Sequence, residues 1–256
     1  MAGMTLDRAW PALFTRAEMQ LLRDPGPPAV LLRPRQKLAL DGDGGAGLHW
    51  LSSGFVGQYR LDRLGRRQFV GIQLPGDCVD LAGLFLGRID HDAEALGPAE
   101  LRGLPPGRLQ ALEAEAPRLP EKLWRISLAE AAINRYWVYR IGRLGGRARI
   151  ANFFCEMLLR LYARGLGAFD RFDLPLTQTD LAEVSGMTAV HVNRMLSELR
   201  DEGICTFAQG TVRVEKLPEL FQIGQYRWDY LDLGPDLDRE IGERVAGPRR
   251  ASSRGA

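Results

Sequence analysis

The hydrophobic residues between positions 188 and 203 recur at the spacing of an α-helix. Thr188 is placed to cap the start of this helix, and Gly203 follows its last turn, where a left-handed residue is expected. The apolar positions fall at i, i+3, i+4 and i+7, which predicts a single buried stripe made of Val192, Met195, Leu196 and Leu199.

A shorter helix is predicted just before it. Thr177 can cap its start, with Asp180 three residues later facing the first-turn amides, and Gly186 ends it. After the second helix come two short β segments, 204–207 and 211–214, separated by a Gln-Gly turn. Helix, glycine turn, helix and small hairpin together predict a winged helix-turn-helix.

The outward face of the second helix carries the candidate chemistry. In a helix-turn-helix, the early turns of this helix enter the major groove of DNA. Arg194 can donate a bidentate pair to guanine, and Asn193 can read adenine or a phosphate. Side chains and amides at the start of the first helix suit phosphate. The predicted DNA-contacting residues are Thr177, Gln178, Thr179, Thr188, Ala189, Val190, His191, Asn193, Arg194, Ser197 and Arg213.

The region before this motif divides into strands and then helices. Residues 5–27 predict a short helical segment. Short strands with glycine-containing turns between them then predict a small barrel or roll. The predicted strands are 29–32, 37–40, 48–51, 55–61, 68–74 and 93–101. A short helix is predicted over 107–116 and a long one over 118–144.

The long helix carries apolar residues at steps of 3, 4 and 7, which fit a coiled-coil seam with Glu130 and Arg140 as polar interruptions. An unpaired helix with such a stripe would leave apolar surface in water, so a symmetric partner is expected. The alternative is that the stripe packs on its own roll, and part of it is expected to do so. The residues predicted for the dimer helix are Leu123, Ile126, Glu130, Ile133, Trp137, Ile141 and Leu144.

Two glycines at 145–146 predict a hinge, and a further helix is predicted over 147–166. The predicted fold class is α+β, with an N-terminal jelly-roll-like β-roll sensor domain, a long dimerisation helix and a C-terminal winged helix-turn-helix domain. The predicted boundaries are 1–116 for the roll, 117–145 for the helix and hinge, 146–225 for the winged domain and 226–256 for a partly disordered tail.

Composition narrows the function further. The chain has 256 residues, three cysteines without a CxxC pair, and three histidines without metal-ligand spacing, so we expect no metal, no cofactor and no disulfide framework. No apolar run approaches the length of a membrane span, which predicts a cytoplasmic protein without a membrane partner. Over 146–225 nine basic residues face ten acidic ones, so DNA binding would depend on local clustering rather than net charge. The five arginines at 135, 140, 143, 147 and 149 either attract DNA over distance or merely solvate the hinge.

The order of these elements resembles the Crp/Fnr family of bacterial transcription regulators. The resemblance covers residues 10–225, and its strongest marks are the stretches from Leu176 to Ala182 and from Thr188 to Leu196. It implies a homodimer that binds a palindromic operator in double-stranded DNA, and it allows RNA polymerase as a second macromolecular partner. Arg194 matches the arginine most typical of the family. Val190 stands where a glutamate is often found, which implies a changed contact at that base pair.

The sensor end departs from the family pattern. Gly76-Asp77 resembles the Gly-Glu turn that grips ribose in cyclic-nucleotide-binding members. The Arg-Ser pair that binds the cyclic phosphate is replaced by the stretch Asp90 to Ala93, whose two carboxylates would repel a phosphate. We therefore predict no control by cAMP and leave the small-molecule effector unidentified. The candidate effector-facing residues are Gly76, Asp77, Arg88, His91 and Asp92. Residues 1–30 also lack the cysteine cluster of the oxygen-sensing branch, and a lone histidine is weak support for haem.

Several alternatives stay open at this level. One is a regulator with a degenerate sensor, controlled by its own abundance or by oxidation of Cys205 at the start of the wing. Another is a protein-interaction adaptor, which would tolerate loss of Arg194. An enzyme on a roll scaffold is disfavoured, because the sequence has no nucleophile–base arrangement and no phosphate loop.

Overall fold

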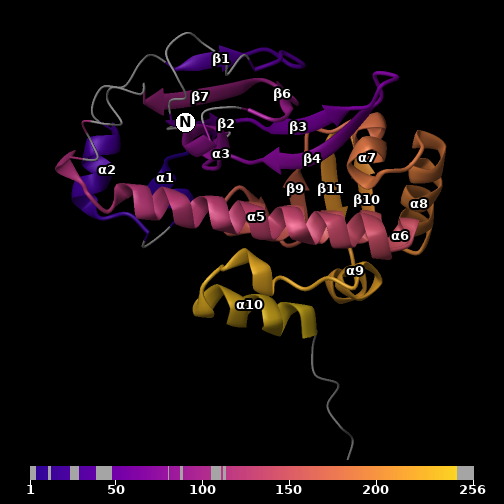
Figure 1. Cartoon of the computed structure of the whole chain (residues 1–256). Coiled ribbons are helices and arrows are strands. Elements are labelled where there is room, and N and C mark those ends of the chain that lie inside the picture. Colours follow the sequence, from indigo (N-terminus) through magenta and orange to yellow (C-terminus); the bar gives the residue numbers. More distant parts are fainter. Residues whose placement is uncertain are drawn as a thin grey trace, which may run out of the picture. The chain divides into compact units, whose positions relative to one another are not determined.

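The computed structural model describes residues 4–10, 13–23, 29–38, 48–79, 81–86, 89–104, 111 and 114–246. It divides into two compact units, Met1–Val138 and Tyr139–Ala256, which are called the N-terminal and C-terminal units below (Figure 1). The division falls inside the long helix α5 (Leu119–Arg143), so this helix contributes its last turn to the C-terminal unit.

The N-terminal unit contains two antiparallel sheets, with strand orders β1-β7-β2-β5 and β4-β3-β6. The strands are β1 (Val30–Leu32), β2 (Leu48–Ser53), β3 (Val56–Leu61), β4 (Arg67–Gln73), β5 (Cys78–Val79), β6 (Asp92–Ala95) and β7 (Ala99–Leu104). The helices before α5 are α1 (Leu6–Ala9), α2 (Arg16–Arg23) and α3 (Leu81–Leu86). The expected roll of short strands is therefore present.

Two of the predicted strands were wrong in detail. The single strand 93–101 is two strands, β6 and β7, which belong to different sheets. The strand 37–40 is reduced to an isolated bridge between Lys37 and Glu94, and positions 39 and 40 lie outside the described residues. Helix α3 forms over residues 81–86, for which no element was predicted. Most of the predicted helix 107–116 also falls outside the described residues.

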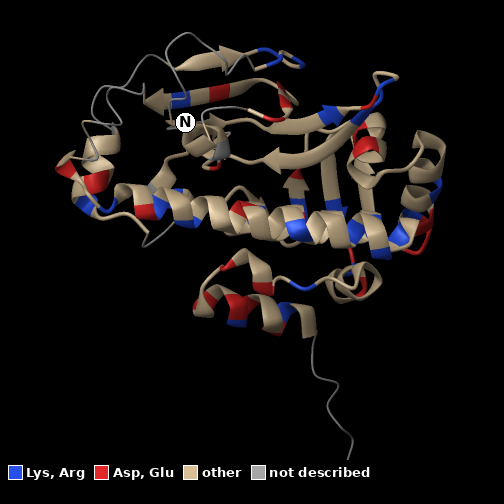
Figure 2. Cartoon of the chain, in the orientation of Figure 1, with Lys and Arg blue, Asp and Glu red and all other residues tan. Residues whose placement is uncertain are grey.

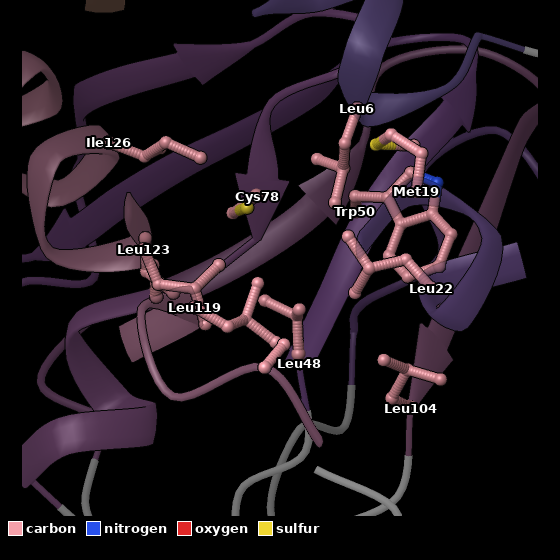
Figure 3. Packing of buried hydrophobic residues seen from close by; sticks show 12 residues of the cluster. Leu6, Met19, Leu22, Leu48, Trp50, Cys78, Leu104, Leu119, Leu123 and Ile126 are labelled. Atoms are coloured by element: carbon pink, nitrogen blue, oxygen red, sulfur yellow. The ribbon is translucent and has the colours of Figure 1, made fainter. Parts of the chain in front are cut away.

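Strand β2 separates two hydrophobic clusters. Leu51 faces a cluster between the sheets, together with Val56 of β3 and Leu101 of β7. Leu48 and Trp50 face the other side, where they pack with α1, α2 and the first turns of α5 (Figure 3). This alternation is what a strand buried on both faces requires. The second cluster fixes α5 to the sheet.

Helix α5 runs over almost the predicted range, but its faces differ from the prediction. Leu123 and Ile126 are completely buried in the core of their own chain, and Trp137 and Leu144 are buried too. Four of the seven predicted dimer-helix residues are therefore buried within their own chain, which corrects the assignment of these four side chains to a partner surface. Glu130, Ile133 and Ile141 are partly buried.

A different side of α5 is open. Trp124 and Leu128 are each 53% exposed and Val138 is 74% exposed. Together with Ala131 and Arg135 they recur at steps of 4, 3, 4 and 3, the spacing of a heptad seam. These five residues are called the exposed stripe of α5. Trp124 meets the ring of Phe85 of α3 edge to face, with centroids 5.7 Å apart, which extends the apolar surface sideways.

The C-terminal unit is built around α6 (Gly146–Tyr162), in which every residue from Ile150 to Leu161 is buried. Around it lie α7 (Gln178–Ser185), α8 (Ala189–Asp201) and α9 (Leu217–Gly224). A four-stranded antiparallel sheet has the order β10-β11-β9-β8, with strands at Cys205–Ala208, Thr211–Val214, Arg171–Asp173 and Gly167–Ala168 respectively. The predicted winged helix-turn-helix is present, and strands β8 and β9 enlarge its sheet beyond the prediction.

The chain beyond α9 folds back on this unit. A short 3-10 helix, η1 (Asp229–Leu231), leads to α10 (Pro235–Ala246), a helix that the prediction of a tail had missed. Ile241 of α10 is completely buried, and Tyr162 of α6 donates a 2.6 Å hydrogen bond to Glu240. The guanidinium of Arg244 lies 4.6 Å from the ring centre of Phe169. Residues 247–256, which were predicted to be disordered, lie outside the described residues.

A buried ionic cluster joins the last turn of α5 to α6 and to this extension. Arg140 of α5 is fully buried and donates from Nε to Asn152 at 2.8 Å and from Nη2 to Glu156. Glu156 also accepts from Arg160 at 3.1 Å and from the hydroxyl of Tyr230 at 3.1 Å. Arg140 is thus not a polar interruption of a coiled-coil seam but the centre of an internal network, called the Arg140–Glu156 cluster below.

Candidate nucleic-acid interface

The start of α7 is fixed by a complete capping box. The Thr177 hydroxyl accepts a 3.1 Å bond from the Asp180 amide, and the Asp180 carboxylate accepts from both the amide and the hydroxyl of Thr177, each at 2.7 Å. The hydroxyl hydrogen of Thr177 is therefore committed to Asp180. Thr177, Gln178 and Thr179 are all exposed, so the first-turn amides and the two following side chains are the donors open to a phosphate.

Gly186 ends α7 in the left-handed conformation, with φ at +61°. Thr188 then caps α8, its hydroxyl accepting from the His191 amide at 3.3 Å. The tight turn and the cap set the direction of α8. Val192, Met195 and Leu199 point inward as predicted, while Leu196 is only partly buried.

The opposite face of α8 is open over its first two turns. Val190, Asn193 and Arg194 are exposed, and Ala189, His191 and Ser197 are partly exposed. Val190 and Arg194 are four residues apart and share one side of the helix, with Asn193 beside them. All of the residues predicted on this helix for base reading therefore lie on the surface.

Arg194 is positioned by its neighbours without being buried. Its Nη2 lies 3.2 Å from Nδ1 of His191, and its Nε lies 3.9 Å from the carboxylate of Glu198. Exposed pairs of this kind contribute little to stability, so the guanidinium is free to exchange them for a base edge.

His191 is itself held against the start of α6. A Cβ atom placed on Gly146 would lie 2.4 Å from Nε2 of His191 and 3.1 Å from the sulfur of Met187. A side chain at position 146 would therefore displace the imidazole of His191. The two glycines at 145–146 were predicted to form a hinge, yet neither has a positive φ among the described residues. The approach of His191 to Gly146 links α8 to α6.

The wing contributes a second basic group. Arg213 of β11 is exposed and lies opposite Arg171 of β9 in the sheet register, with Thr206 of β10 on its other side. Like charges directly opposite each other are unfavourable in an isolated sheet. Within the described part of the C-terminal unit, neither arginine has a carboxylate within ion-pair distance. Arg171 was missed because no strand was predicted over residues 171–173, a stretch too short to show a strand pattern in the sequence.

The other arginines near the hinge are mostly occupied. Arg149 donates to the carbonyl oxygens of Ser185, Ile141 and Leu144, at 2.6, 2.8 and 3.0 Å, and burial lowers its pKa. Arg147 pairs with Glu202, and Arg140 lies in the Arg140–Glu156 cluster. These three arginines tie helices together, whereas Arg135 and Arg143, the other two of the group, are exposed. Acidic and basic residues are also mixed along α10 (Figure 2).

Cys205 has the environment of a structural thiol. It is 1% exposed, and burial, with a smaller effect of Glu215, raises its pKa to about 12. A thiol with so high a pKa is almost wholly protonated at neutral pH and is a poor nucleophile. Burial also raises the pKa values of Cys78 and Cys155 well above the ordinary range. This geometry argues against control by oxidation of Cys205.

The predicted effector-facing residues come from different elements of the roll. Gly76 and Asp77 lead into β5, whereas Asp92 begins β6 in the other sheet, and Arg88 lies outside the described residues. Asp77 is buried, and its carboxylate accepts from the amide of Leu74 at 2.8 Å, so it closes its own turn. His91 pairs with Asp90 at 2.9 Å, and this hydrogen bond lowers the pKa of Asp90 despite opposing desolvation.

No three histidines, cysteines and carboxylates among the described residues come together in a way that would hold a metal ion. None of the helices in the same part of the chain combines the length and apolar character needed to cross a membrane.

Comparison with known proteins gives matches to both units. Residues 29–115 match a family model described as a cyclic nucleotide-binding domain, and residues 148–223 match one described as a Crp-like helix-turn-helix domain. Together these stretches cover more than half of the chain.

Curated relatives match over both units as well. The anaerobic regulatory protein of Aggregatibacter actinomycetemcomitans is 23% identical over 192 residues, 75% of this chain and 74% of the relative. The nitrogen fixation regulation protein FixK of Bradyrhizobium diazoefficiens is 28% identical over 159 residues, 62% of this chain and 66% of the relative. The structure of FixK2 from Bradyrhizobium japonicum has the same fold, with a TM-score of 0.67, 24% identity, and coverage of 77% of this chain and 96% of that one.

Proposed function

This chain belongs to the Crp/Fnr family of bacterial DNA-binding transcription regulators, and we propose that it acts as a homodimer whose two winged units read the halves of one palindromic site. One observation carries the proposal. The apolar stripe of α8 is buried, and this leaves Val190, Asn193 and Arg194 together on an open surface of the first two turns. This is the part of a recognition helix that enters the major groove.

The proposed contacts fall into two kinds. Arg194 pairs with a guanine edge and Asn193 with an adjacent base or phosphate. The phosphates on either side meet the first-turn amides of α7 with Gln178 and Thr179, and the facing arginines of the wing, Arg171 and Arg213. Because Arg171 and Arg213 repel each other, a phosphate placed between them removes an unfavourable interaction as it binds.

The exposed stripe of α5 is the proposed dimer surface. Its heptad spacing and its exposure support packing against the same stripe of a second copy. Family members typically act as dimers, and a palindromic site requires the two copies of α8 to lie about one DNA turn apart, roughly 34–36 Å. The apolar area that Trp124, Leu128 and Val138 leave in water would then be covered.

The effector is outside this proposal. The stretch that would supply a phosphate-binding Arg-Ser pair carries Asp90 and Asp92, and Asp77 is used within its own turn. We therefore keep the expectation that cAMP does not control this regulator. Contact with RNA polymerase and a cytoplasmic location are expectations of the same kind.

The experiment is a selection followed by a titration. Full-length protein is used to enrich duplexes from a random-sequence library, and the enriched duplex is titrated in a gel-shift assay at fixed salt. Arg194→Ala is expected to lower the specific affinity by about 10- to 100-fold, as loss of a bidentate base contact does. The matched control is Arg239→Ala on α10, an arginine that is likewise exposed and paired with a nearby carboxylate. Absence of any enriched sequence, or equal binding by the two variants, would support the adaptor alternative instead.

A further inference from the structure

Val190 is the most exposed large hydrophobic residue in the described part of the chain. It exposes 81% of its surface, more than Leu64, Leu31 or Val138. It is the second residue of α8, in the first turn of the helix and two positions after the Thr188 cap. An apolar side chain at this position contributes almost nothing to the core, so its chemistry is available for a ligand.

The neighbours of Val190 define what that ligand offers. Arg194 lies one helical turn further along the same side, and Asn193 lies beside it. This face of α8 therefore presents the amide of Asn193 and the guanidinium of Arg194, with the two methyl groups of Val190 next to them. The methyl groups can neither donate nor accept a hydrogen bond, so a polar base atom pressed against them would lose water without replacement.

The major groove contains one apolar feature. Among the four bases only thymine presents a methyl group there, on C5, whereas guanine, cytosine and adenine present donors and acceptors. Val190 therefore complements thymine and disfavours cytosine, whose exposed amino group would remain unpaired. A glutamate at this position would do the reverse, because a carboxylate accepts from the cytosine amino group.

We propose that Val190 reads the C5-methyl group of a thymine next to the guanine read by Arg194, and that it sets the base preference of each operator half at that position. This inference rests on the proposed function, because it needs α8 to lie in the major groove. It extends that function by naming a base and the atom of the base that is recognised.

The test removes the methyl group alone. In the enriched duplex each thymine is replaced in turn by deoxyuridine, which keeps base pairing and deletes only the C5-methyl group. For the wild-type protein, one position in each half is expected to lower affinity about fourfold on replacement, the equivalent of about 0.8 kcal/mol for one buried methyl group. The Val190→Ala variant is expected to bind the thymine and deoxyuridine duplexes at that position within a factor of two of each other.

Two further variants complete the test. Val30→Ala removes the same atoms from a valine that is exposed at 51% in the N-terminal unit, and it is expected to keep the full discrimination. Val190→Glu, carried through a new selection, is expected to exchange thymine for cytosine at the same position.

The outcomes separate the two claims. If no duplex is enriched, the proposed function fails before this inference is reached. If a duplex is enriched and bound, but deoxyuridine has no effect at any position, the inference is overturned. It is also overturned if Val190→Ala retains the discrimination or if Val190→Glu leaves the selected sequence unchanged.

Discussion

Replacing Glu156 by glutamine tests the buried cluster that attaches the last turn of α5 to the C-terminal unit. The change keeps the shape of the side chain and removes its charge. Arg140, with 1% of its side chain exposed, then stays in the interior without its counter-ion. Arg160 loses the same ionic partner at 3.1 Å, and Tyr230 loses a charged acceptor.

The magnitude follows from the burial of the pair. Removing one member of a buried ion pair costs about 3–5 kcal/mol, because the remaining charge has no compensation. Domains of this size are stable by about 5–15 kcal/mol, so a loss of this size is a large share of the total. By contrast, Asp236→Asn removes the partner of Arg239 from an exposed 2.8 Å pair on α10, and such pairs contribute about 0.2–1 kcal/mol.

Hydrogen exchange measured by mass spectrometry on peptides of α6 is the suitable assay. It reports the opening free energy of the C-terminal unit alone, which a melting curve of a protein with two compact units does not. We expect Glu156→Gln to lower the opening free energy several-fold more than Asp236→Asn. Adding Arg140→Met is expected to recover part of the loss, since the uncompensated charge is then gone. If Glu156→Gln changed α6 protection by less than 1 kcal/mol, the reasoning about this cluster would be refuted.

Three further results are expected. Leu128→Glu, which places a charge in the exposed stripe of α5, should shift the protein toward monomer in analytical ultracentrifugation, whereas Asn134→Glu on the flank of the helix should not; equal behaviour of the two would remove the stripe from the interface. Gly146→Ala should displace His191 and weaken specific DNA binding several-fold in a gel-shift titration. The melting temperature should not fall, because alanine favours helices more than glycine does. Unchanged affinity would show that the contact between His191 and position 146 does not affect DNA binding. The stabilisation from the buried thiol of Cys205 should be complete below the unfolded pKa of about 8.5 and fall as pH rises toward its folded pKa of about 12. Urea unfolding across this range should therefore show a smaller decline in stability for the Cys205→Ala variant than for the wild type, and equal declines would contradict this.

The sequence predicted best where periodicity and caps agreed. Helix α8 was predicted from its apolar spacing and from Thr188, and α5 was predicted to within a residue of each end. Both are long enough for a helical pattern to exceed chance. The two- and three-residue strands β8 and β9 are too short to show a pattern of their own, and they form only because β11 supplies their partner.

The errors on α5 have a different cause. Spacing shows which residues share a side of a helix but not what that side meets. Leu123 and Trp124 are adjacent, yet the first is buried against the sheet and the second is half exposed. Arg140 looked like an interruption of an apolar seam because its partners Asn152 and Glu156 come from the next helix, and nothing local announces them.

Helix α10 was missed even though its signals were present. Pro235 stands at the first helical position, Asp236 and Asp238 occupy the first turn, and Arg244 occupies the last. This arrangement complements the helix dipole and is typical of a helix. The glycine- and arginine-rich composition of the residues after α10 favours disorder. The prediction gave this composition more weight than the helix-end signals at Pro235 and Arg244.

Dimethyl sulfate probing of the enriched duplex tests the central claim most directly, because it methylates N7 of guanine in the major groove and N3 of adenine in the minor groove. If two winged units present α8 to one duplex, bound protein will protect guanine N7 in two clusters about 10 base pairs apart, and Arg194→Ala will lose both. Protection of adenine N3 alone, or a single guanine cluster unaffected by Arg194→Ala, would contradict the account.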